Sequence, residues 1–278
     1  MLFDSHSHLH FHQFDNDREE IIKKLRDFNI KAINVGTDLE ESKKAVELSK
    51  RYPDVLWASV GLHPNDISVE IDWKEFEKLA SNEIVVAIGE CGLDYFRSPS
   101  ESEIARQKEI FIKQIELAKE LNKPLILHCR PSSGTQDAYD DVLDVLVSCH
   151  LSLVSGNGVA HFFVGSKETA KKFLDLEFYI SFSGSITFPL KALRQTIGGN
   201  QFIAGEQYEK VVKFIPMNRI LIETDSPLVA PVPYRGKRNE PAYVEFTARQ
   251  IAKWKNLDFK EVARQTAENA KNLFNISI

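Results

Sequence analysis

Two histidines, His6 and His8, end the first apolar run of the chain and are separated by one residue. Side chains alternate between the two faces of a β-strand, so both imidazoles point to the same side and can share one metal ion. Because His10 and His12 continue this alternation, an incidental metal-binding tract in the first dozen residues is the alternative.

Five more side chains that can bind metals stand at the ends of apolar, strand-like runs further along the chain. They are Glu90, His128, His161, Glu223 and Asp225. An ionisable group at the end of an apolar run carries a high desolvation cost unless it is paired or coordinates a metal. Their recurrence at the same position of successive runs therefore indicates one shared metal centre.

The donor types favour a hydrolytic centre with two divalent ions. Imidazoles suit zinc, and carboxylates accept zinc, manganese or magnesium, so the identity of the ions stays open. Two ions about 3.5–4 Å apart can activate a water and stabilise both oxygens of a displacement. We expect Glu90 to bridge the ions and Asp225 to act as the general base. The expected metal ligands are His6, His8, Glu90, His128, His161 and Asp225.

Strand-like runs alternate with helical patterns along the whole chain. The runs lie at 2–5, 31–36, 55–61, 84–89, 125–129, 158–162, 178–182 and 219–223. Apolar residues recur at helical spacing in 17–28, 40–51, 73–80, 102–121, 136–148, 166–175, 241–254 and 258–273. Eight such units predict an α/β fold, a TIM-type (β/α)8 barrel that forms a single domain over residues 1–278, with a doubly wound open sheet as the alternative.

A barrel explains the placement of the candidate ligands, because active sites of this fold lie at the carboxyl ends of the strands. The segment 198–210 is longer than the connection expected before the last strand. We expect it to form an elaborated loop or a short helix.

Composition restricts the partners and the compartment. The net charge is −5 and the pI is near 5.9, so any polyanion must be held locally rather than by a basic surface. No apolar run approaches a membrane span and no signal peptide begins the sequence, so we expect a cytoplasmic protein without membrane contact or an obligate protein partner. Cys91, Cys129 and Cys149 lack metal-binding spacing and predict reduced thiols.

Seven motifs follow one another over nearly the whole chain. In order they are FDSHSHLH, GLHP, GECGLDY, LILHCR, ETDSP, RGKRNEP and ENAKNLF. Together they resemble the TatD family of metal-dependent deoxyribonucleases, in the amidohydrolase-like TIM-barrel superfamily. The resemblance implies the six ligands named above and makes His63 a substrate-facing residue. One departure is Val164, which stands in HFFVG where the family commonly has the serine of HCFSG, so a hydroxyl that could contact substrate is absent.

Basic residues near the expected centre could hold phosphates. Arg130 lies two residues after His128 and points the same way on an extended chain, although a salt bridge to Glu90 or Asp94 is equally compatible with its position. Arg235, Lys237 and Arg238 follow the last strand, where a loop on the rim of a barrel can reach across its mouth. A solvated loop is the alternative for these three residues.

Several neighbours could support the ligands. Asp4 shares a strand face with His6 and either orients a ligand or is solvated. Asp94 is expected to orient a neighbouring residue. Glu223 shares a face with Asp225, and a metal or an arginine would relieve the repulsion between the two carboxylates. For the nearby aromatic residues, core packing is favoured over base stacking; they are Tyr95, Phe96, Phe162 and Phe163.

The leading hypothesis is a metal-dependent phosphodiesterase that cleaves DNA, from an end or on single strands, because no long basic track is available for a duplex. A second hypothesis keeps the metals and changes the bond to an ester or amide, as in the deacylation of an aminoacyl-tRNA. A non-catalytic metal-binding module is the third, and the presence of every expected ligand disfavours it.

Overall fold

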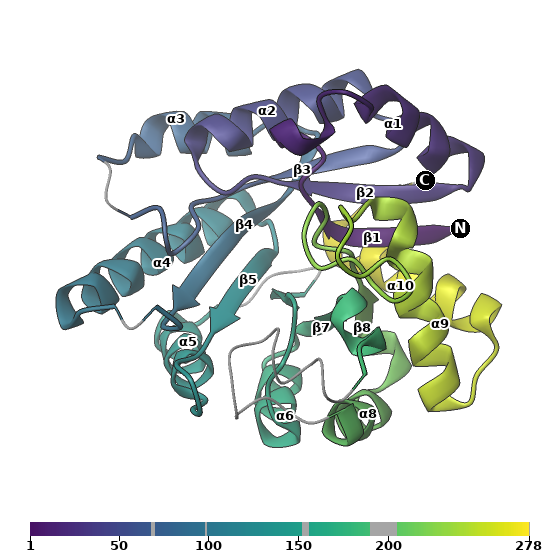
Figure 1. Cartoon of the computed structure of the whole chain (residues 1–278). Helices are drawn as coiled ribbons and strands as arrows, with labels where there is room; N and C mark the ends of the chain where they lie inside the picture. Colours follow the sequence, from purple (N-terminus) through teal and green to yellow (C-terminus); the bar gives the residue numbers. More distant parts are fainter. Residues whose placement is uncertain (68–69, 98, 152–155, 190–204, 278) are drawn as a thin grey trace.

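The computed structural model is described here for residues 1–67, 70–97, 99–151, 156–189 and 205–277. Eight parallel strands within these ranges follow one another around a barrel in chain order (Figure 1). They are β1 (Leu2–Ser7), β2 (Ile30–Val35), β3 (Leu56–Val60), β4 (Val85–Asp94), β5 (Leu125–Arg130), β6 (Gly158–Ala160), β7 (Tyr179–Phe182) and β8 (Ile220–Ile222). The predicted (β/α)8 barrel is therefore confirmed, and the doubly wound sheet, which requires a reversal of strand order, is wrong.

The barrel closes between its first and last strands, close to the expected metal ligands. Ser7 and Ser226 form an isolated parallel bridge. The backbone N–H of His8 donates to the carbonyl of Ser226 at 2.8 Å, and that of Asp225 donates to the carbonyl of His6 at 2.9 Å. Closure thus brings the histidine pair of β1 beside the carboxylate that follows β8.

Helices cover the outside of the barrel (Figure 1). They are α1 (Arg18–Asp27), α2 (Leu39–Arg51), α3 (Trp73–Ala80), α4 (Glu101–Leu121), α5 (Asp137–Ser148), α6 (Lys167–Asp175), α8 (Gly205–Phe214), α9 (Val244–Lys255) and α10 (Phe259–Phe274). Side chains that accept a hydrogen bond from a backbone N–H of the first turn begin five of them, as sequence patterns of this kind predict; these caps are Asp38, Asp72, Ser100, Ser166 and Asp258. None of the helices that the structure describes is long and apolar enough to cross a membrane.

Alternate residues along the strands pack into two apolar clusters. Leu125 and Leu127 belong to the large cluster between the strands and the surrounding helices, whereas Ile126 belongs to a smaller one. The smaller cluster includes residues of α10, and the Phe274 ring of that helix lies 6.5 Å from the Phe3 ring of β1. This smaller cluster lies inside the barrel. Apolar side chains therefore fill the barrel below the polar ends of the strands.

Two further predictions concern the segment before β8 and the cysteines. Most of 198–210 lies in residues 190–204, outside the described residues, and its remaining part begins helix α8. The thiols of Cys91, Cys129 and Cys149 are all free, which agrees with the expectation of reduced cysteines.

Candidate metal centre

Five of the expected ligands line a cavity of about 530 Å³ at the carboxyl ends of the strands, and His6 is buried beside them. They come from the end of β1, from β4 and β5, and from positions one residue after β6 and three residues after β8. The rings of His6 and His161 stack with centroids 3.7 Å apart, although the two residues come from opposite parts of the chain. One centre therefore contains the histidines of both halves of the sequence.

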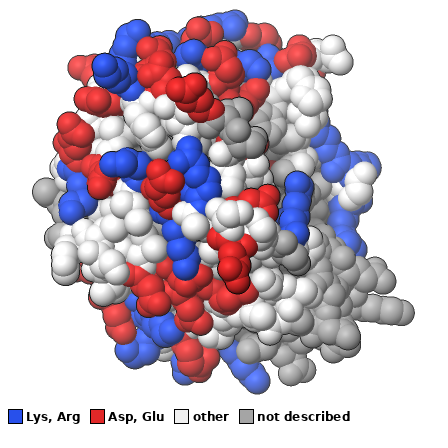
Figure 2. Space-filling view, turned by 90° about the vertical axis from the view of Figure 1, so that its left-hand side faces the viewer, with Lys and Arg blue, Asp and Glu red and all other residues white. Residues whose placement is uncertain are grey.

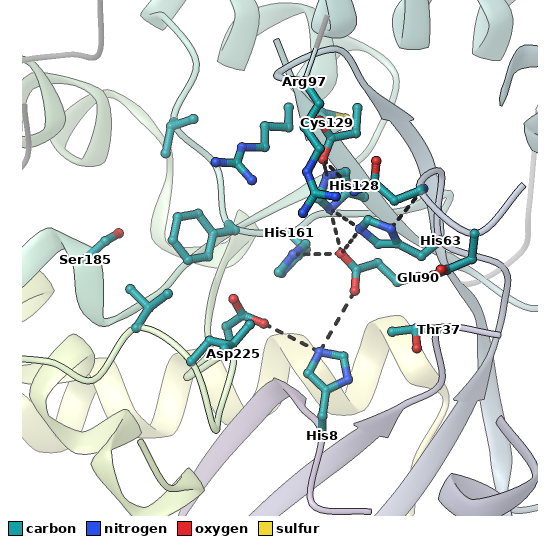
Figure 3. A pocket seen from close by; sticks show the side chains of 18 of the residues that line it. His8, Thr37, His63, Glu90, Arg97, His128, Cys129, His161, Ser185 and Asp225 are labelled. Atoms are coloured by element: carbon teal, nitrogen blue, oxygen red, sulfur yellow. Dashed lines mark hydrogen bonds and ion pairs between the residues drawn. The ribbon is translucent and has the colours of Figure 1, made fainter. Parts of the chain in front are cut away.

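Glu90 lies in the middle of this centre (Figure 3). Its Oε2 atom lies 3.4 Å from His6 Nε2 and 3.9 Å from His8 Nε2. Its Oε1 atom lies 2.6 Å from His128 Nδ1 and 3.3 Å from His161 Nε2. The two oxygens of one carboxylate thus face two different sets of imidazole nitrogens.

The half of the centre near β1 contains four candidate donor atoms. His6 Nε2 and His8 Nε2 are 3.1 Å apart, and Asp225 Oδ1 lies 3.8 Å and 3.5 Å from them. Two nitrogens bound to one tetrahedral zinc ion at about 2.0–2.1 Å lie about 3.3 Å apart. His6, His8 and Glu90 therefore form a group that could hold a single divalent ion, and Asp225 lies next to it.

The other half of the centre contains a histidine that was expected to face the substrate. His63 Nε2 lies 3.2 Å from His128 Nδ1 and 3.7 Å from Glu90 Oε1. Burial, and then the charge of His128, lower the pKa of His63 to about 3, so its imidazole is neutral at pH 7. His63 therefore joins the donor atoms of His128, His161 and Glu90 as a fourth candidate ligand, which the sequence pattern did not indicate.

Hydrogen bonds on the far side of three imidazoles determine which nitrogen faces the centre. Val35 accepts a hydrogen bond from His8 Nδ1 at 2.7 Å. The carboxylates of Glu223 and Asp94 contact His161 Nδ1 at 3.0 Å and His128 Nε2 at 3.1 Å. When these outer nitrogens carry the protons, the inner nitrogens keep their lone pairs for a metal. Asp94 thus orients a neighbouring ligand, as the sequence predicted.

Burial and ion pairing act in opposite directions on the pKa values of the centre. Burial lowers the pKa of His6 to about 3. Burial also disfavours charge on His128, yet its hydrogen bonds with Asp94 and Glu90 raise its pKa to about 9. Burial opposes ionisation of Glu90, but neighbouring histidine charges, that of His161 above all, hold the pKa of its carboxyl well below its usual range. The carboxylates therefore supply negative charge that a divalent cation can neutralise.

Asp4 connects the two strands that carry the first half of the centre. It is completely buried, so the solvated alternative for this residue is wrong. Its carboxylate accepts hydrogen bonds from Thr224 N at 2.8 Å, Thr224 Oγ1 at 2.6 Å and His6 N at 3.3 Å. Asp4 therefore positions the backbone next to His6 and Asp225 and contacts no imidazole.

The alternating histidines after His8 do not extend the centre. His10 is buried and its Nδ1 lies 2.9 Å from Asn34 Oδ1, whereas His12 is exposed in a short 3-10 helix. The alternative of an incidental metal-binding tract in the first dozen residues is therefore wrong.

Comparisons with known proteins agree with this arrangement. A model of the family described as TatD related DNase matches residues 3–275. The chain belongs to this family. YabD of Bacillus subtilis, described as an uncharacterized metal-dependent hydrolase, is 41% identical over 280 residues, which cover 100% of both chains. The 3′-5′ ssDNA/RNA exonuclease TatD of Pectobacterium carotovorum is 31% identical, over 99% of this chain and 100% of that protein.

A solved structure places the fold in the same group. The crystal structure of YJJV, a TatD homologue from Escherichia coli, superimposes with a TM-score of 0.82 at 26% identity, and the match covers 99% of this chain and 98% of that one. This TatD-family chain is therefore a metal-dependent hydrolase with a TIM barrel, and its His and Glu clusters are of the kind that bind divalent ions.

Of the arginines predicted to contact phosphates in this TatD-family protein, one lines the cavity and two do not. Arg130 lines the cavity, with its guanidinium 3.8 Å from the centre of the Phe96 ring. Arg238 is paired with Asp17 at 2.8 Å and 2.5 Å, and Arg235 lies 4.5 Å over the Phe188 ring. Neither of these two arginines lines the cavity, so their contact with substrate stays a prediction.

Several cavity residues were missed from the sequence, among them Arg97 and Phe11. Arg97 lines the cavity three residues after Asp94, and Phe11 lines it three residues after His8, with its ring 4.6 Å from the His8 ring. Their only sequence signal is proximity to a ligand, because both lie in turns whose course the sequence does not reveal. Of the aromatic residues weighed for base stacking, Tyr95 and Phe163 are buried and only Phe162 lines the cavity.

Backbone strain is concentrated at the cavity. Phe162, Asp225 and Val229 have φ angles of 46°, 59° and 52°, and all three line the cavity. Side chains with a Cβ atom rarely adopt this left-handed region, least of all a β-branched one. The other described non-glycine residues with positive φ each lie one or two residues after the end of a helix. The strained backbone thus presents Phe162 and Asp225 to the cavity.

Proposed function

We propose that this protein is a deoxyribonuclease that hydrolyses phosphodiester bonds with two divalent ions, from an end or on single strands of DNA. The observation that supports this best is the division of the ligand set by Glu90, whose oxygens face two groups of histidines. One carboxylate can bridge ions about 3.5–4 Å apart, the separation found in two-metal phosphatases and nucleases. The Pectobacterium relative is named as an exonuclease of single-stranded DNA and RNA, which supports a nucleic-acid substrate.

The residues of the chain have separate roles in this proposal. When bound, the ions would supply positive charge to the phosphate and lower the pKa of a water. Asp225 reaches towards His8 with Oδ1, and its side chain is 13% exposed to the cavity, so its other oxygen can accept a proton from the attacking water. Glu223 and Asp94 keep the ligand nitrogens of His161 and His128 directed inward.

The shape and charge of the mouth support a strand end over a duplex. A volume of about 530 Å³ is within the range of small-molecule pockets and accommodates about one nucleotide. On the face towards which the strands run, Lys and Arg of the described residues lie beside Asp and Glu (Figure 2). No continuous basic track is formed there by the described residues, so binding relies on contacts inside the cavity.

One assay separates the candidate reactions. We would incubate protein reconstituted with Zn²⁺, Mg²⁺ or Mn²⁺ with end-labelled single-stranded DNA, double-stranded DNA, RNA and an aminoacyl-tRNA, each with and without chelator. The proposal expects chelator-sensitive shortening of single-stranded DNA from one end. Release of the amino acid from the tRNA without cleavage of any phosphodiester bond would contradict it and support the ester hydrolase instead.

The variant His161→Ala serves as a control for contaminating nuclease, since it removes a ligand from the His128 half of the centre. Activity that survives this substitution and chelation equally well does not come from the metal centre.

A further inference from the structure

Two arginines line the cavity on the side of β4 and β5. Arg130 is the last residue of β5, and Arg97 follows β4 by three residues. Arg97 lies on the same side of the cavity as His128 and Cys129, away from Ser185 and Asp225 (Figure 3). Both guanidinium groups are thus placed beside the half of the centre that contains His128.

Neither arginine has a carboxylate partner. In the described part of the chain Arg97 makes no hydrogen bond or ion pair, and the Arg130 guanidinium lies 3.8 Å from the centre of the Phe96 ring. Arginines elsewhere, such as Arg26 and Arg249, are paired with Asp54 and Glu245. Arg97 is exposed and Arg130 is partly buried, so the guanidinium groups of both can be reached from the cavity.

Asp66 and Asp94 interact electrostatically with Arg97 and Arg130, but within the described residues they form no ion pair with them. Asp94 uses Oδ1 to accept from Phe96 N at 3.0 Å, and its Oδ2 contacts His128 Nε2 and Asn65 Nδ2. Asp66 also lines the cavity, and burial raises the pKa of its carboxyl while the charge of Arg97 opposes this shift. The cavity therefore contains two guanidinium groups whose hydrogen-bond donors are available to a ligand.

We propose that Arg97 and Arg130 bind a second phosphate, next to the phosphodiester that the metal centre cleaves. This inference rests on the proposed function. An arginine fork matches the geometry of a phosphate and donates two parallel hydrogen bonds, and the Phe96 face holds the Arg130 fork in one plane. In the described part of the chain no hydrogen bond or ion pair joins either guanidinium to a candidate ligand, so the arginines can hold a phosphate other than the one being cleaved.

The consequence is a requirement on the substrate. A phosphomonoester, or a carboxylic ester without phosphates, fills only the metal centre and leaves both arginines unpaired in the cavity. A nucleotide chain with a phosphate adjacent to the scissile bond fills both positions. The preferred substrate is therefore an oligonucleotide with at least two consecutive phosphates.

The test uses three thymidine dinucleotides: one without a terminal phosphate, one with a 5′-phosphate and one with a 3′-phosphate. We expect the wild-type kcat/KM for one of the phosphorylated forms to exceed that for the plain dinucleotide by about ten- to a hundredfold, the range of charge-assisted hydrogen bonds. In Arg97→Ala and in Arg130→Ala this gain, taken relative to cleavage of the plain dinucleotide by the same variant, should fall to less than about threefold.

The matched control is Arg26→Ala, which removes an exposed arginine that pairs with Asp54, outside the cavity, and should keep the full gain. Equal kcat/KM values for all three dinucleotides in the wild-type protein would overturn the inference and leave the nuclease proposal intact. If the wild-type protein cleaves none of them, the proposed function fails, and binding of the same dinucleotides measured by calorimetry decides about the arginines. Binding that needs the terminal phosphate and Arg97 supports the site, and phosphate-independent binding rejects it.

Discussion

The protonated nitrogen of each imidazole determines whether the centre can bind metal. His161 contacts Glu223 Oε1 through Nδ1 and directs Nε2 to Glu90, while the N–H of Phe162 donates to the same Glu223 oxygen at 2.7 Å. Glu223 is fully buried and is paired with no arginine in the described part of the chain. This carboxylate therefore fixes the ligand tautomer and the strained turn that follows it at the same time.

We predict that Glu223→Gln weakens metal binding, because the amide removes the negative charge that makes His161 a better donor. Outer-shell changes of this type reduce affinity by about 10- to 100-fold. Titration with Zn²⁺ followed by metal analysis should show one tightly bound ion, compared with the two proposed for the wild-type protein. Glu261→Gln, on the exposed face of α10, is the control and should behave as wild type. Unchanged affinity in Glu223→Gln would exclude this role of the carboxylate.

Asp225 combines two functions in the proposed mechanism, as a ligand through one oxygen and as a proton acceptor through the other. The substitution Asp225→Asn keeps an oxygen donor and removes the base, so turnover should fall by about 10²-fold or more while metal content and KM change little. Steady-state kinetics on single-stranded DNA with parallel metal analysis measure this. A variant that retains both ions and near-normal kcat would show that another group accepts the proton.

Residue types predicted which side chains meet at the carboxyl ends of the strands, but not all of the side chains that line the cavity. His6, His8 and His128 are recognisable because an ionisable group at the end of an apolar strand needs a strong partner. Arg97 has no such signal, since a surface arginine in a turn costs nothing wherever it points. His63 was identified through a motif, but only the closed barrel shows that its nitrogen lies among the ligand atoms.

At the scale of elements, hydrogen bonds between β1 and the residues after β8 position the candidate ligands on both sides of one proposed metal ion. The Asp4 carboxylate accepts hydrogen bonds from the N–H and the hydroxyl of Thr224. Thr224 Oγ1 in turn accepts a hydrogen bond from Ser226 N at 3.2 Å. All of these atoms belong to buried residues. The distance between His6 and Asp225 is therefore set by side-chain hydrogen bonds as well as by the strand ladder.

We predict that Thr224→Val destabilises the protein by about 1–3 kcal/mol, because the buried Asp4 oxygen loses its hydroxyl donor. Urea unfolding of the metal-free protein measures the difference without a contribution from metal binding. The matched variant Thr224→Ser keeps the hydroxyl and should retain most of the stability. Equal losses in both variants would mean that the threonine methyl group, not the hydrogen bond, matters.

The order of elements was predictable, but their ends at the metal centre were not. Alternating apolar runs identified all eight strands, because a parallel strand buried on both faces has a distinctive composition. The expected run 84–89 becomes β4 over Val85–Asp94, since pairing with β5 continues to Asp94 and Arg130. The run 158–162 becomes only Gly158–Ala160, because the chain turns at Phe162 to bring His161 inward. Tertiary contacts decide both ends.

For the whole molecule, a bound ion would act as a cross-link at the mouth of the barrel. Its ligands come from β1, β4, β5 and the segments after β6 and β8, which are distant in sequence. Coordination that requires all of these segments exists only in the folded chain, so the binding free energy adds to the free energy of unfolding.

We therefore predict that chelation lowers the melting temperature and that Zn²⁺ or Mn²⁺ restores it. A ligand at 1,000 times its Kd adds about 4 kcal/mol, and for a chain of this size each kcal/mol raises Tm by about 2–4 °C, so the shift should be roughly 10 °C. Differential scanning calorimetry on chelated and reloaded protein measures it. His161→Ala should show a smaller shift because one half of the centre is incomplete, whereas His12→Ala, which changes an exposed histidine outside the centre, should show the full shift. An identical Tm with and without metal would mean that the ions do not cross-link the strands, since a cross-link between distant segments of the folded chain must raise the free energy of unfolding.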